Sequence, residues 1–167
     1  MRHPIAILHF LVIMLGANNL LSQPVSTQDD LLPEVFMIGE NEEAYERMVS
    51  DCNNHLLNVC EGSMDIAYNV WLHMVSKLEE FAQEKSFDIK GTKLWLTAYW
   101  NYDGSIKHLV YYPKPNSKNM DFQELTEFLK EFSTVYKLPL KSTSCFSHYG
   151  SANFPSFANH YFKRIEK

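Results

Sequence analysis

The run from Leu94 to Tyr112 constrains the fold of this chain more than any other stretch, because it predicts a β-hairpin. Two runs rich in aromatic and β-favouring residues, 94–100 and 106–112, flank the turn sequence Asn-Tyr-Asp-Gly-Ser. Gly104 can take the positive φ that a tight turn requires without a steric cost. Because an isolated hairpin is only marginally stable in water, further strands and helices must pack against it.

Side chains alternate along a strand, so the hairpin has two faces. Both faces are largely apolar, and we therefore do not expect an exposed edge with one wet side. In the first strand, one face carries Leu94, Leu96, Ala98 and Trp100, and the other carries Trp95, Thr97 and Tyr99.

Three segments have apolar residues at the spacing of amphipathic helices. They predict one helix over about 40–61, a second over about 63–85 and a third from 121 to about 138. Ser63 or Asp65 can cap the start of the second helix. The expected apolar stripes are Tyr45, Met48, Val49, Cys52, Leu56 and Val59; then Ala67, Val70, Trp71, Met74, Leu78 and Phe81; then Leu125, Phe128, Leu129, Phe132, Val135 and Tyr136.

The order of the expected elements defines the fold class. Two N-terminal helices precede the hairpin, a helix follows it, and one or two short strands are expected within 144–161, the first of them joining the hairpin. Residues 31–38 form a short apolar segment that reads as an extended arm or an edge strand. The sequence therefore predicts a two-layer α+β domain with a small antiparallel sheet packed by helices.

Bulk composition limits the range of functions. The chain has 167 residues, which is enough for one domain with a substantial core. Its formal net charge is -5, and no basic stripe is present, so we expect no nucleic-acid partner.

The N-terminus has the pattern of a signal peptide. A short basic start, Met1-Arg2-His3, precedes a nearly continuous apolar run from Ile5 to Leu15. The run is shorter than the roughly 20 residues of a transmembrane helix. Cleavage after Ser22 or Ala17 would export the chain to the periplasm or the medium, with no stable membrane insertion; the alternative is an uncleaved anchor. The expected organisation is a signal peptide over 1–22, a leader or extended arm over 23–39, and a single α+β domain over 40–167.

Three cysteines remain after the signal peptide: Cys52, Cys60 and Cys145. On one continuous helix, Cys52 and Cys60 would be about 12 Å apart along the axis, too far for a disulfide. Any bond would therefore join Cys145 to one of the other two. The favoured expectation is that all three are small buried apolar side chains.

The stretch from Gly91 to about Phe157 resembles the TonB C-terminal domain family. The matching residues are Lys90 to Leu96, the turn and strand from Asp103 to Lys107, and the helix from Asp121; residues 33–38 also resemble a leader found before that domain. The resemblance implies a protein-binding fold of the cell envelope, which recognises partners by strand addition at an exposed sheet edge.

No motif predicts catalysis, a cofactor or a metal. Cys52 and His55, or Cys145 and His148, are three residues apart, but neither pair lies in a recognisable nucleophile turn. The spacing of Cys52, His55 and Cys60 is not that of a structural zinc site. We therefore expect no catalytic residue, no metal and no cofactor.

The candidate binding residues are the aromatic side chains of the hairpin, because Tyr and Trp give a large rigid contact area with a polar tip. We interpret the chain as an exported, non-enzymatic module that binds another envelope or secreted protein. The alternatives are an exported immunity protein that inhibits a delivered toxin and a small thiol enzyme or hydrolase. The predicted binding set is Trp95, Tyr99, Trp100, Tyr102, Tyr111 and Tyr112.

Overall fold

The structure is a computed structural model, and it describes residues 32–157 of the chain. The expected signal peptide over 1–22 and the first part of the leader lie outside the described residues. In chain order the elements are β1 Val35–Met37, α1 Glu42–Asp51, β2 Asn54–His55, α2 Leu56–Val59, α3 Met64–Glu84, β3 Lys93–Trp100, β4 Ile106–Pro113, α4 Phe122–Val135 and β5 Phe146–Asn153.

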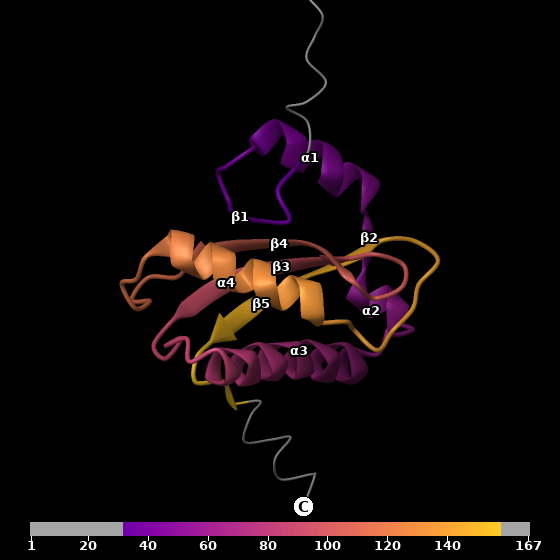
Figure 1. The fold of residues 1–167 in the computed structure, drawn as a ribbon. Coiled ribbons are helices and arrows are strands. Elements are labelled where there is room, and N and C mark those ends of the chain that lie inside the picture. The colour runs from indigo at the N-terminus through magenta and orange to yellow at the C-terminus, as the bar shows by residue number, and fades with distance from the viewer. Residues whose placement is uncertain (1–31, 158–167) are drawn as a thin grey trace, which may run out of the picture.

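The strands form one five-stranded sheet in the order β1-β4-β3-β5-β2 (Figure 1). The central strand β3 is antiparallel to both of its neighbours, β4 and β5. The short strands β1 and β2 pair in parallel with β4 and β5. The predicted α+β class is confirmed. The sheet is mixed because two segments from before the hairpin add to its outer sides.

The predicted hairpin forms β3 and β4, and its turn is held by local hydrogen bonds. The Asn101 N–H donates to the Ser105 carbonyl at 2.9 Å, and Asp103 Oδ1 accepts from the Ser105 N–H at 3.1 Å. Gly104 has φ +88°, and a Cβ there would lie 2.3 Å from the Leu138 carbonyl oxygen. Only glycine fits this position without a shift of the backbone.

One sheet face is covered by the two long helices, and we call it the helix-covered face. Helix α4 packs over β1 and β4, and α3 packs over β5. Phe81 of α3 contacts Phe128 of α4 with ring centroids 5.5 Å apart, which joins the two helices. Of the two faces expected for the first hairpin strand, this one carries the four side chains that are 0% exposed: Leu94, Leu96, Ala98 and Trp100.

The second face is covered only in part. Helix α1 lies over one end of it, on the opposite side of the sheet from α3 (Figure 1). Tyr45 of α1 packs on Phe36 of β1 and shares a 3.1 Å hydrogen bond with the Tyr99 hydroxyl. Toward the other end of β3, Trp95 is 39% exposed. This face is therefore half core and half open surface.

The expected helix over about 40–61 is not continuous, and this prediction was wrong. The chain leaves the helix after Asp51, forms β2, and resumes as the short α2. The Asn54 side chain accepts from the His55 N–H at 2.9 Å, a local bond that competes with the helical ladder. Cys52 consequently joins the cluster beneath α1, while Leu56 packs in the main core.

The second predicted helix is confirmed as α3, with Ser63 as its cap. The Ser63 hydroxyl accepts from the Ile66 N–H at 3.3 Å. The third is confirmed as α4, but Val135 is 65% exposed rather than part of the apolar face. Tyr136 has left the helix, and its ring stacks on Phe132. Within 32–157, no helix combines the length and apolarity needed to cross a bilayer.

Candidate protein-binding site

The outer side of β5 is the longest stretch of free strand backbone at the two ends of the sheet. Strand β5 has eight residues, and β2 pairs only with Phe146 and Ser147. The six residues from His148 to Asn153 therefore have no strand beyond them among the described residues. At the other end of the sheet, the edge strand β1 is only three residues long. Short edge strands limit unwanted pairing, so β5 is the edge that is open to a new strand.

The alternation of backbone hydrogen bonds along β3 shows which backbone N–H and C=O groups of β5 point away from the sheet. The Lys114 N–H donates to the Lys93 carbonyl, so Lys93 faces β4 and Leu94 faces β5. Leu94 pairs with Ala152, so Ala152 bonds inward. Because inward and outward groups alternate along an antiparallel strand, the backbone groups of Tyr149, Ser151 and Asn153 point away from β3.

The edge has no charged residue or proline to block a new strand, although the Trp71 indole of α3 already bonds its Ser151 carbonyl. Its sequence, Phe-Ser-His-Tyr-Gly-Ser-Ala-Asn, contains no Lys, no Asp or Glu and no Pro. Exposed edges are commonly protected by charged residues, prolines or bulges. Ser151 and Asn153 are exposed, and Tyr149 is 60% exposed.

A groove of about 900 Å³ runs beside this edge, between β5 and the first half of α3. Its walls include Tyr68 and Leu72 of α3, and Phe157 beyond the end of β5. Tyr68 is 61% exposed and Phe157 is 91% exposed, so large apolar surface is left open to solvent. A free strand edge next to an apolar groove is the geometry of sites that bind extended peptides.

Trp71 forms the floor of the groove, and the position of its ring requires a glycine in β5. A Cβ on Gly150 would lie 2.6 Å from the Trp71 indole, so the ring packs directly against the strand backbone. The indole also contacts the His148 ring at a tilted angle, with ring centroids 4.8 Å apart, and its Nε1–H donates to the Ser151 carbonyl at 3.4 Å. The floor is thus a buried and fixed aromatic surface.

A buried polar contact lies beside the groove, at Ser156. Glu79 of α3 is 7% exposed, and its Oε2 accepts from the Ser156 N–H at 2.9 Å and from the Ser156 hydroxyl at 2.5 Å. These bonds satisfy the buried carboxylate. They also hold the chain after β5 against α3, which fixes Phe157 at the groove.

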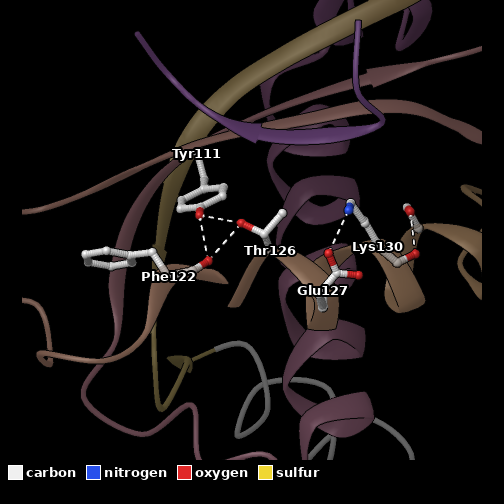
Figure 2. Close-up of polar contacts among 6 residues, drawn as sticks. Tyr111, Phe122, Thr126, Glu127 and Lys130 are labelled. Atoms are coloured by element: carbon white, nitrogen blue, oxygen red, sulfur yellow. Dashed lines mark hydrogen bonds and ion pairs between the residues drawn. The ribbon is translucent and has the colours of Figure 1, made fainter. Parts of the chain in front are cut away.

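Three of the six aromatic residues predicted to bind a partner lie in the core. Trp100 is 0% exposed, Tyr111 is 2% exposed and Tyr99 is 4% exposed. The Tyr111 hydroxyl donates to the Phe122 carbonyl at 3.1 Å and lies 2.7 Å from the Thr126 hydroxyl, so it anchors the start of α4 (Figure 2). Burial raises the pKa of both Tyr99 and Tyr111.

The other three are exposed, and two of them are neighbours. Trp95 pairs with Tyr112 across β3 and β4, and it stacks on Tyr149 of β5 with centroids 5.5 Å apart. We call Trp95, Tyr112 and Tyr149 the aromatic patch. Lys114 Nζ lies 3.9 Å from the Trp95 ring centroid and hydrogen-bonds the Ser151 hydroxyl. Tyr102, in the turn at the other end of β3, is 67% exposed and stands apart.

The cysteines are not available as a nucleophile–base pair in this state. Cys52 and Cys145 form a disulfide with Cα atoms 5.3 Å apart, whereas the sequence favoured three unbonded cysteines. Cys60 is buried, and burial raises the pKa of its thiol. Burial, with His55 nearby, lowers the pKa of His148. Among the residues described, no group of three or more His, Cys, Asp or Glu is placed to hold a metal.

Sequence reasoning missed the residues that line the groove. The sequence indicated only that Tyr68 and Leu72 belong to an amphipathic helix and that Tyr149 belongs to a strand. Gly150, within the segment 144–161 where one or two short strands were expected, was the one local signal, since glycine in a strand marks a close approach of another group. The identity of the edge strand is a property of the whole sheet and could not be read locally.

The fold and the site define the class as a small α+β domain with one open strand edge beside an apolar groove. No family model, curated protein or solved structure matches the chain.

Proposed function

We propose that this chain is an exported, non-enzymatic module that binds another protein of the periplasm or cell envelope by accepting an extended segment at the β5 edge. The observation that supports it is the unprotected run from His148 to Asn153 beside the groove. Strand addition uses main-chain hydrogen bonds for affinity and side-chain pockets for specificity. This is also the mode of binding implied by the resemblance to the TonB C-terminal domain.

The disulfide supports export. Disulfides persist in oxidising compartments such as the periplasm and are rare in the cytosol. The bond between Cys52 and Cys145 lies next to the pairing of β2 with β5. An oxidised bond would therefore hold β2 in place and keep the open edge at a fixed length.

A second candidate function is inhibition of a delivered toxin, as an immunity protein. The aromatic patch favours it, because exposed Trp and Tyr side chains are enriched at the centres of protein interfaces. Binding of a folded toxin would use Trp95 and Tyr112 and would not require the free backbone of β5.

The test is a pull-down of the mature chain, from Gln23, against envelope and secreted fractions of the source cell, with bound proteins identified by mass spectrometry. The key variant is Ser151→Pro, which removes an outward N–H and leaves the bonds to β3 intact. Ser151→Ala is the matched control, since it loses the same hydroxyl and keeps the N–H. Asn153→Pro removes a second outward N–H, and it replaces Ser151→Pro as the test variant if Ser151→Pro does not fold.

Strand addition predicts that the wild type and Ser151→Ala recover the same stoichiometric partner. Ser151→Pro should weaken binding about tenfold or more, because one lost hydrogen bond is worth about 1 kcal/mol and the edge no longer fits a new strand. Equal recovery by Ser151→Pro, with loss on Trp95→Ala, would refute strand addition and favour the toxin inhibitor.

A further inference from the structure

We propose that the β5 groove selects an extended segment of another exported protein with apolar side chains at alternate positions and a Lys or Arg at the end that lies nearest Asp65. This inference rests on the proposed function and specifies the chemistry of the partner. It follows from the length of the edge, the two faces of an added strand and the charge of the groove.

The length of the free edge sets the length of the bound segment. Six residues of β5 are open, from His148 to Asn153. At about 3.3 Å per residue, they span roughly 20 Å. Strand β2, held by the disulfide between Cys52 and Cys145, blocks the edge before His148. The partner segment therefore has about six residues in contact.

The two faces of an added strand meet different surroundings. Successive side chains of a strand point to opposite faces. Those on the helix-covered face would enter the groove against Tyr68, Leu72 and Phe157. Those on the second face would stand beside Tyr149 and Ser151, close to solvent. The alternate side chains of the partner that enter the groove therefore gain most from being apolar, since they are removed furthest from solvent.

The charge of the groove favours a cation at one end. Among the described residues that line it, Asp65 is the only acidic or basic side chain apart from His148. Burial lowers the pKa of His148 and so favours the neutral ring. Asp65 is exposed, and it has no ion-pair partner within 32–157. A Lys or Arg of the partner would supply the missing charge, and an acidic residue would be repelled.

Asp65 lies at a defined end of the edge. Trp71 contacts Gly150 and His148, and Glu79 contacts Ser156, so α3 and β5 advance in the same direction. Asp65, in the first turn of α3, is therefore at the β2 end of the groove, and Phe157 is at the other end. The position of the cation in the partner is thus specified.

The test is selection of a displayed library of random peptides of about eight residues on the oxidised mature chain. Binding of the selected peptides is then measured on Ser151→Pro and Ser151→Ala and on four further variants of the chain. Asp65→Asn and Asp65→Lys change the charge, and Tyr68→Ala removes the aromatic wall. Val135→Ala is the matched control, since Val135 is equally exposed but lies on α4.

We expect peptides with apolar residues at every second position and a terminal Lys or Arg. Asp65→Asn should weaken them about two- to fivefold, the value of a partly exposed ion pair, and Asp65→Lys should weaken them further. Tyr68→Ala should weaken them roughly tenfold. Val135→Ala should leave them unchanged.

The inference and the proposed function fail in different ways. Selected peptides that lose binding on Ser151→Pro but show no alternation, or prefer acidic residues, would overturn the inference and leave strand addition intact. Peptides that bind Ser151→Pro as well as Ser151→Ala, or an empty selection with a chain that dimerises through β5, would overturn both.

Discussion

At the scale of single residues, the contact between Gly150 and Trp71 decides the shape of the groove. The indole is 3% exposed and lies against the strand at a distance that leaves no room for a methyl group. Trp71 also caps the outward Ser151 carbonyl. The floor of the site and the open edge thus depend on the same glycine.

Gly150→Ala should destabilise the protein by about 1–3 kcal/mol, the usual cost of forcing a group into a packed site. An alanine elsewhere in a strand would be slightly favourable relative to glycine. A loss of stability on Gly150→Ala would therefore indicate the close contact with Trp71. Denaturant unfolding measures the change. In a Trp71→Phe background the cost should shrink, because the ring is smaller. Equal or greater stability of Gly150→Ala would contradict the close contact.

At the scale of elements, the disulfide joins three segments. Cys52 follows α1, Cys145 precedes β5, and β2 begins two residues after Cys52. The bond therefore fixes α1 on the second face and β2 on the β5 edge at the same time. Its sequence separation is 93 residues, so it closes a long loop.

Replacing Cys52 and Cys145 together by serine should lower the free energy of unfolding by about 2–4 kcal/mol, since the bond restricts the unfolded chain. Cys60→Ala keeps the bond and is the control. The double variant should also leave the outer backbone groups of Ser147 free to pair with a competing strand, because no disulfide then holds β2 in place. A double variant as stable as the wild type under oxidising conditions would show that the bond does not form in solution.

At the scale of the whole molecule, the sequence predicted the parts of the fold that local patterns encode. The hairpin, α3 and α4 follow from alternation, helical periodicity and the turn at Gly104. The parallel pairing of β1 with β4 and of β2 with β5 was not predictable, because each pair joins a short segment to a strand that is distant in the chain. The break after Asp51 depends on Asn54 and on the bond between Cys52 and Cys145, which the helical pattern of residues 40–61 conceals.

The candidate site was predictable only in part. Tyr102 lies in the turn and Tyr112 comes just before a proline, positions that favour exposure, and both side chains are more than half exposed. Trp100 and Tyr111 are also aromatic residues of the hairpin, but their side chains lie on the helix-covered face and are buried. The β5 edge and the groove arise only when α3, β5 and β2 come together, so no local pattern could indicate them.

Backbone hydrogen exchange on the full mature chain is the measurement that shows whether β5 presents a free edge. The inward amides of Gly150 and Ala152 bond to β3 and should exchange slowly. The outward amides of Tyr149 and Ser151 should exchange much faster, giving alternate protection along one strand. When a selected peptide binds, these two amides should become protected. Uniform slow exchange across 148–153 in the free chain would show that the edge is already covered and would contradict the account.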